Sequence, residues 1–254
     1  MKQHDQMSRA LILTLTASLI IISAGYAMAQ GRGQGASAAP VGPWMDKNLP
    51  PDQRADLVIA QMTLDEKIQL VHGGQGGAGG GQAGASRSNG GAGWIPGIPR
   101  LGIPDINMAD SSVGVTRGAA MSRYSTLLPS TLALAASWDL EAAHLYGSVI
   151  GRELRDQGYN MSIGGGVDIT REPRNGRNFE YVGEDPVLAG KMVGRLMKGV
   201  QDQHIMGDLK HYALNDQETG RNIGTVIMDK RTMRETDLLA FEIAYLESKA
   251  AGVM

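Results

Sequence analysis

The chain has 254 residues with 42% hydrophobic content, which is enough for one domain with a substantial core. Its formal net charge of −2 favours neither nucleic acid nor an anionic membrane surface as a partner. Cysteine is absent, which excludes disulfides, thiolate metal sites and a cysteine nucleophile.

The N-terminus has the three parts of an export signal. Lys2 and Arg9 are positively charged, an apolar run follows them, and Ala27-Met28-Ala29 has the small-residue pattern of a cleavage site. The apolar run is short for a membrane span, so a retained anchor is the weaker alternative. We predict a signal peptide at residues 1–29, a disordered leader at 30–49, and export to the periplasm or the extracellular space without membrane association after cleavage.

Two short helices are predicted next, followed by a glycine-rich segment. Asp52 can cap the first helix, and Thr63 with Glu66 can form the capping box of the second. Residues 73–93 contain eleven glycines among small residues. They lack the Gly-Lys-Ser/Thr ending of a phosphate-binding loop and do not connect a strand to a helix, as that loop or a dinucleotide fingerprint would require. We therefore predict a flexible loop, and a dehydrogenase-like or phosphate-handling enzyme is only a weak alternative.

An acidic residue ends the first predicted strand. Residues 95–104 are rich in proline and glycine and lead into a strand predicted over residues 105–110, which ends on Asp110. A (β/α) barrel places its active site at the carboxyl ends of its strands, so this is a candidate site position. A role for Asp110 as a local turn or cap residue explains the pattern equally well.

Strands and helices alternate along the rest of the chain. Further strands are predicted at residues 127–136, 159–163, 205–209, 225–228 and 252–254, and further helices at residues 140–157, 188–200 and 231–249. The alternation is typical of an α/β protein with parallel strands. It does not separate a doubly wound sheet from a barrel.

Two polar clusters interrupt this alternation. The first, residues 170–186, is predicted as a loop because Pro173 and Gly176 oppose a continuous helix. Its charges need internal ion pairs or a polar ligand, and the expected pairs are Arg171 and Arg174 with Glu172, Glu180 or Glu184. The second cluster covers residues 208–221. Its Glu218 and Arg221 are equally suited to pair structurally or to face a ligand.

The two clusters together resemble a known family. The first contains Arg-Glu-Pro-Arg-Asn-Gly-Arg-Asn-Phe-Glu and Gly-Glu-Asp-Pro, and the second contains Lys-His-Tyr-Ala and Asn-Asp-Gln-Glu. Both motifs, in this order, are similar to the N-terminal domain of glycoside hydrolase family three, the β-glucosidase group. The resemblance runs from about Met62 to the C-terminus. It implies an α/β fold of the (β/α)8 or TIM barrel type, incomplete in this chain and occupying residues 50–254.

The resemblance also implies a function, the retaining hydrolysis of β-linked glucosides in carbohydrate metabolism. Asp110, Arg177, Lys210 and His211 match family positions that line the sugar subsite. The nucleophile and the acid/base, the two carboxyls of retaining hydrolysis, match no residue here, and the resemblance places both beyond Met254 in a missing C-terminal part of the same enzyme. We therefore expect the four residues to bind a β-glucoside or oligosaccharide, with no catalytic residue, cofactor or metal in this chain.

The side chains themselves suit a neutral, hydroxyl-rich ligand. Buried sugar hydroxyls need hydrogen-bond partners, and charged partners form the stronger bonds. Asp110 can accept, Arg177 and Lys210 can donate, and His211 can do either. A non-catalytic carbohydrate-binding or scaffold protein is the main alternative. Three further histidines do not have the spacing of metal ligands: His72, His144 and His204.

Overall fold

The computed structural model describes residues 42–72, 88–116 and 124–254. The predicted signal peptide at residues 1–29 lies outside these ranges, as do most of the leader at 30–49 and most of the glycine-rich segment at 73–93. Pro43–Met254 form one compact unit. Within the described ranges, no helix combines the length and the apolar character that are needed to cross a bilayer.

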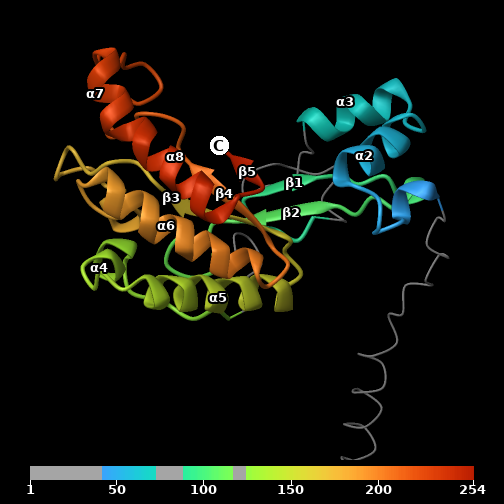
Figure 1. The fold of residues 1–254 in the computed structure, drawn as a ribbon, viewed down its shortest axis with the longest axis horizontal. Helices are drawn as coiled ribbons and strands as arrows, with labels where there is room; N and C mark the ends of the chain where they lie inside the picture. The colour runs from blue at the N-terminus through green and yellow to red at the C-terminus, as the bar shows by residue number, and fades with distance from the viewer. Residues whose placement is uncertain (1–41, 73–87, 117–123) are drawn as a thin grey trace, which may run out of the picture. The chain divides into compact units, whose positions relative to one another are not determined.

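Five strands form one sheet, in which each strand lies beside the strand that precedes it in the chain (Figure 1). Their bounds are β1 Gly93–Ile95, β2 Ile106–Ala109, β3 Met161–Gly166, β4 Met206–Lys210 and β5 Gly252–Val253. β1 is antiparallel to β2, whereas β2 to β5 are parallel. The register aligns Met108 with Met161 and Met161 with Met206, so the carboxyl ends of β2, β3 and β4 meet at one edge.

Helices connect the parallel strands. The α-helices are α2 Pro51–Ile59, α3 Leu64–His72, α4 Thr131–Ala135, α5 Leu140–Asp156, α6 Pro186–Gln201, α7 Lys230–Glu235 and α8 Asp237–Ser248; the 3-10 turns are η1 Pro43–Met45, η2 Pro99–Leu101 and η3 Asn178–Glu180. α6 packs between α5 and α8 (Figure 1). Parallel strands in sequential order with intervening helices are the repeat of a (β/α)8 barrel, so the predicted α/β fold, an incomplete TIM-type barrel, is confirmed.

Side-chain caps mark the starts of α3, α5 and α6, whereas the cap predicted at Asp52 is wrong, because Pro50 occupies the N-cap position of α2. The Asp139 carboxylate accepts from the main-chain N–H groups at the start of α5. Asp185 does the same at the start of α6, where Pro186 occupies the first turn. At α3, the main-chain N–H of Glu66 donates to Thr63 Oγ1 at 3.2 Å and that of Thr63 donates to Glu66 Oε2 at 2.9 Å, which confirms the capping box.

The core lies between the sheet and the row of three helices. Tyr146, Ile150 and Leu154 of α5 are buried in it, as are Leu196 of α6 and Leu209 of β4. Each such side chain contributes about 1.5–3 kcal/mol by leaving water, so this shared core holds the strands in their order.

α5 and α6 approach each other at two glycines. A Cβ atom added at Gly147 would lie 1.9 Å from the carbonyl oxygen of Leu196, and one added at Gly199 would lie 2.1 Å from that of His144. No side chain fits at such distances, so both positions require glycine for this packing. The two glycines therefore set the distance between the helices that flank β3.

The strand predicted at residues 127–136 is wrong. Thr131–Ala135 form the short helix α4, which begins where the Ser130 hydroxyl accepts from the main-chain N–H of Ala133 at 3.1 Å. A short apolar run does not distinguish a strand from a buried helix, and here the cap decided the outcome.

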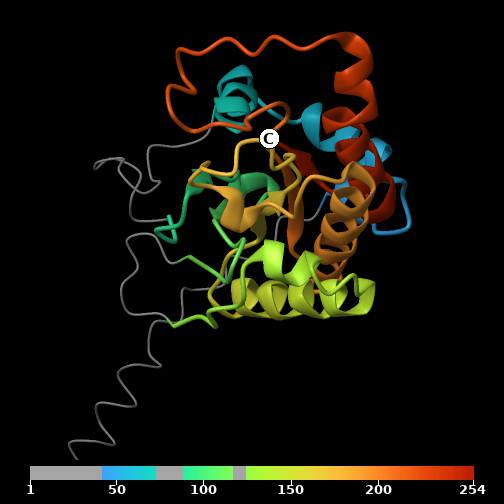
Figure 2. The same cartoon turned by 90° about the vertical axis from the view of Figure 1, so that its left-hand side faces the viewer.

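Two further predictions need correction. Residues 231–249 form two helices, α7 and α8, because Thr236 between them has a non-helical backbone (φ −121°, ψ −92°). Residues 225–228 are irregular instead of extended in a strand, and belong to the long loop between β4 and α7 (Figure 2). The sequence also did not predict β1, which pairs with β2 directly after the glycine-rich segment.

Candidate functional site

Polar side chains gather at the edge where the carboxyl ends of the parallel strands meet. Asp110 follows β2 directly, Lys210 is the last residue of β4, and His211 is the next residue. Arg177 comes from the loop between β3 and α6. Asp110, Arg177 and Lys210 line a pocket of about 280 Å³, together with Ser112, Val113, Thr116, Phe179 and Glu180, whereas His211 is not among its lining residues.

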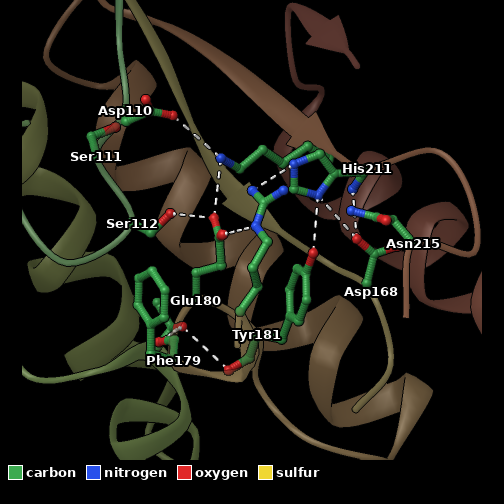
Figure 3. A network of polar contacts seen from close by, with 12 residues as sticks. Asp110, Ser111, Ser112, Asp168, Phe179, Glu180, Tyr181, His211 and Asn215 are labelled. Carbon is green, nitrogen blue, oxygen red and sulfur yellow. Dashed lines mark hydrogen bonds and ion pairs between the residues drawn. The ribbon is translucent and has the colours of Figure 1, made fainter. Parts of the chain in front are cut away.

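The Lys210 ammonium is buried between two carboxylates, those of Asp110 and Glu180, which are labelled in Figure 3. Its Nζ lies 3.1 Å from Glu180 Oε2 and 3.6 Å from Asp110 Oδ1. The Ser112 hydroxyl donates to the same Glu180 oxygen at 3.0 Å. The Glu180 side chain is 5% exposed and that of Asp110 is 52% exposed, so Asp110 is the carboxylate that a ligand can reach.

The Arg177 guanidinium has a different partner for each nitrogen. Nε donates to Glu180 Oε1 at 2.5 Å, Nη1 to Glu218 Oε1 at 3.2 Å, and Nη2 to His211 Nε2 at 2.8 Å. Burial disfavours the ionised form of Glu180, but the hydrogen bond from Arg177 and the charges of Lys210 and Arg177 outweigh this effect. The pKa of Glu180 therefore lies below its ordinary value.

His211 lies between Arg177 and a buried carboxylate, Asp168 (Figure 3). Asp168 Oδ2 is 2.9 Å from the main-chain nitrogen of His211 and 3.1 Å from its ring Nδ1. The Tyr181 hydroxyl is also 3.1 Å from Nδ1. Burial, helped by the nearby Asp168 charge, raises the pKa of Tyr181, so this hydroxyl keeps its proton. The peptide bond between Lys210 and His211 is cis.

The four residues predicted for the site are therefore in one continuous network. We call it the pocket network; its members are Asp110, Lys210, Glu180, Arg177 and His211, each in contact with the next. Glu180 joins the two cations, whereas the sequence suggested it as a partner for Arg171 or Arg174, and that prediction is wrong.

Sequence reasoning missed two residues of this site. Asp168 follows β3 as Asp110 follows β2, so the same signal, an acid just after a strand, identifies it. Glu180 lies three residues after Arg177 in the turn η3, a spacing that places two side chains side by side once the turn is known.

A second charged group lies near Asp168. We call it the Arg171 cluster; its members are Arg171, Asp216 and Asp237. Arg171 Nε is 3.1 Å from Asp216 Oδ2 and its Nη2 is 2.5 Å from Asp237 Oδ2, so the loop partners predicted for Arg171 are wrong. Burial, then the charges of Asp237 and Asp168, raise the pKa of Asp216 to about 7 despite Arg171.

The remaining charged residues of the two polar clusters pair locally. Arg174 Nε is 2.9 Å from Glu172 Oε1, which is one of the predicted pairs. Arg221 Nη1 is 3.1 Å from Glu218 Oε1, the same oxygen that accepts from Arg177. Within the described ranges, no three histidine, aspartate or glutamate side chains are grouped to hold a metal ion.

Fold and site together define a class of protein. Sequential parallel strands with acidic and basic side chains at their carboxyl ends are the arrangement of a (β/α) barrel with a polar site at its mouth. Residues 98–254 match the family described as the glycosyl hydrolase family 3 N terminal domain. The chain belongs to this family.

Individual relatives agree with this assignment. A β-glucosidase of Bacteroides ovatus is 34% identical over 250 residues, which are 94% of this chain and 30% of that protein. β-Glucosidase 3B of Thermotoga neapolitana, solved with glucose, is similar over 78% of this chain and 28% of its own, with 36% identity and a TM-score of 0.71. DesR, a β-glucosidase of Streptomyces venezuelae solved with D-glucose, has 35% identity and a TM-score of 0.69 over 79% of this chain and 24% of its own. The chain thus spans less than a third of each relative.

Proposed function

We propose that this chain carries the sugar-binding part of a β-glucosidase, an enzyme that hydrolyses β-linked glucosides with retention. One observation carries the proposal. In a chain of glycosyl hydrolase family 3, Asp110, Arg177, Lys210 and His211 lie in one network at the barrel mouth. The names of the relatives, and the glucose bound in two of the similar structures, support a glucoside as the substrate.

The hydrogen-bonding capacity of the pocket suits a neutral sugar. A guanidinium has five N–H groups and an ammonium has three. Arg177 uses three of its five toward described residues, and Lys210 directs two toward carboxylates, so both keep N–H groups for a ligand. Half-exposed Asp110 supplies the acceptor. Sugar hydroxyls both donate and accept, so they can satisfy this set without adding charge.

Retaining hydrolysis needs a nucleophile and an acid/base carboxyl about 5–5.5 Å apart. Glu180 is unsuited to either role because its two oxygens are engaged by Arg177 and Lys210. Asp168 is fully buried beneath His211. We therefore place the nucleophile and the acid/base in a part of the parent enzyme outside these residues. The share of its relatives that this chain spans supports that view.

An aryl β-glucoside tests this proposal with two proteins, residues 30–254 and the whole reading frame in which they lie. We expect the longer protein to release the aryl group and the shorter one to be inactive, since general acid–base catalysis alone contributes about 10²–10⁴-fold. Turnover by residues 30–254 would show that catalysis lies within this chain. If the longer protein binds glucose without turnover, the alternative of a non-catalytic carbohydrate-binding protein is correct.

We also propose that the protein is exported, to the periplasm or the extracellular space, and cleaved after Ala29. The support is the charged, apolar and small-residue pattern of residues 1–29. N-terminal sequencing of the exported protein should begin at Gln30. An intact N-terminus recovered with the membrane fraction would contradict the proposal and favour an anchor.

A further inference from the structure

The contacts of His211 determine which of its ring nitrogens carries the proton. Nε2 lies 2.8 Å from Nη2 of Arg177, and a guanidinium can only donate hydrogen bonds. Nε2 must therefore be the accepting nitrogen. At the other side of the ring, Nδ1 lies 3.1 Å from Asp168 Oδ2, an oxygen that already accepts from the main-chain N–H of His211. Both contacts are met by a neutral imidazole with its proton on Nδ1, and the Tyr181 hydroxyl, 3.1 Å from Nδ1, can then serve as a second acceptor.

Asp168 is well placed to impose this state. Its side chain has no solvent exposure, and a single oxygen, Oδ2, accepts from both the main chain and the ring of His211. These two bonds fix the ring in position and in orientation. Asp168 itself does not line the pocket, whose wall includes Arg177 and Lys210.

We propose that Asp168 is a positioning residue that holds His211 in the Nδ1–H tautomer and so makes its Nε2 the hydrogen-bond acceptor for Arg177, which lines the pocket. The accepting Nε2 in turn holds one nitrogen of Arg177, while Glu180 holds another. Asp168 thereby controls the direction of the Arg177 N–H groups that remain for a ligand. This inference rests on the proposed function only in naming that ligand as a sugar.

The tautomer has a consequence for sugar recognition. Nε2 has one lone pair, which Arg177 occupies, so the tautomer acts on a sugar through the orientation of the guanidinium. With the proton on Nε2, the ring would instead face the donors of Arg177 with a donor of its own, and the contact at 2.8 Å would be lost. Without the carboxylate, ring and guanidinium would both be free to turn.

The experiment uses the whole reading frame with histidine labelled in the ring with ¹⁵N. The NMR spectrum distinguishes a protonated from an unprotonated ring nitrogen, and a His211→Gln variant identifies the His211 signals by their disappearance. We expect the wild type to carry the proton on Nδ1. A proton on Nε2 in the wild type would overturn the inference, and this measurement needs no sugar.

Three variants separate positioning from stability. Asp168→Ala removes the acceptor, so we expect His211 to lose its preference for Nδ1–H and kcat/KM for an aryl β-glucoside to fall about 10-fold to 100-fold. Asp168→Asn keeps an accepting oxygen and should retain the tautomer and most of the activity. Asp139→Ala also removes a carboxylate that accepts main-chain N–H groups, but at α5, where it touches no histidine. It should lower stability and leave the tautomer unchanged.

The NMR spectra and the activities of these variants decide between the possible outcomes. An Nδ1–H tautomer that persists in a folded Asp168→Ala protein would overturn the inference. If Asp168→Ala does not fold, the wild-type and Asp168→Asn spectra still decide, because an Nε2–H signal in either would contradict it. If the wild type has the expected tautomer but hydrolyses no glucoside, the proposed function is wrong and the positioning of His211 by Asp168 stands.

Discussion

The pocket network and the Arg171 cluster are two neighbouring groups of charges, one balanced and the other with an excess of carboxylates. In the pocket network, Glu180 and Asp110 face the cations Lys210 and Arg177. In the Arg171 cluster, one guanidinium serves both Asp216 and Asp237, with Asp168 nearby. Each of these three aspartates has a buried Oδ1 atom without a hydrogen-bond partner among the described residues. Matched charges fix donors in place, whereas excess carboxylates favour binding of a proton.

The two groups should therefore respond to pH in opposite directions. The pKa of Glu180 lies below its ordinary value. The contribution of Glu180 to stability is therefore fully present above the ordinary pKa and is lost as pH falls through the lowered pKa. The pKa of Asp216 is raised to about 7. In the folded protein Asp216 keeps a proton that it has released in the unfolded chain, so the free energy of unfolding falls as pH rises from about 4 to 7.

The largest effect should come from Glu180→Gln in the pocket network. The substitution keeps the size of the side chain but leaves Lys210 and Arg177 without their shared counter-charge. Breaking a buried ion pair by removing one partner costs about 3–5 kcal/mol of the free energy of unfolding. Urea unfolding at pH 7 measures it. A loss below about 1 kcal/mol would show that the network is not a tightly coupled unit.

Asp216→Asn should remove the pH dependence that arises from the Arg171 cluster. The amide resembles the protonated acid, so the fall in stability between about pH 4 and pH 7, which we expect to be about 2–4 kcal/mol in the wild type, should flatten. Urea unfolding at several pH values checks this. Asp229→Asn is the control, because Asp229 is exposed and its pKa is lowered by its hydrogen bonds to Thr232, so it should not flatten the same interval. An unchanged slope in Asp216→Asn would assign the pH dependence to another group.

Asp110→Asn should weaken the interaction with the sugar and leave the fold intact. Asp110 is 52% exposed, and Lys210 keeps Glu180 as its partner, so the free energy of unfolding should change by about 0.5 kcal/mol or less. Loss of a charged acceptor for sugar hydroxyls should lower kcat/KM of the whole enzyme about 10-fold to 100-fold. Asp52→Asn, at the exposed start of α2, is the matched control. Equal activity of the two variants would remove Asp110 from the sugar site.

The smallest effect should come from Glu172→Gln. Glu172 lies in the same loop as Glu180 and also pairs with an arginine, but its partner Arg174 is 88% exposed. Exposed ion pairs are screened by water, so we expect no measurable change in urea unfolding. A loss comparable to that of Glu180→Gln would mean that burial is not what distinguishes the two pairs.

The sequence predicted the residues that lie at strand ends, because strand ends can be located from the apolar runs before them. Asp110, Lys210 and His211 were placed in this way, with the family resemblance deciding between site and cap. Partners within an irregular loop could not be predicted. Glu180 and Arg171 both lie in residues 170–186, and only the folded path of that loop sends one to Lys210 and the other to Asp237.

The helices and strands were predicted wrongly where tertiary contacts or a helix cap outweighed the local pattern of apolar residues. Residues 231–249 read as one amphipathic helix, but Thr236 breaks it where Arg171 donates to both Thr236 and Asp237. The apolar residues 127–136 fit a strand or a buried helix equally, and the Ser130 cap favoured the helix. β1 was missed because a glycine-rich sequence shows no alternation of apolar and polar residues.

The glycine contact between α5 and α6 has a consequence for how the protein tolerates change. Gly147 and Gly199 are buried between two helices of the outer layer, yet these helices flank β3, which leads to Asp168. A methyl group at either position must push one helix outward, and β3 is bonded between β2 and β4. A directed-evolution library that varies only pocket residues would leave this spacing untouched. Randomising these two helix positions would instead change the spacing of the helices that support β3, and we expect the width of the pocket to change with it. Neither position is close to a residue that can touch the ligand.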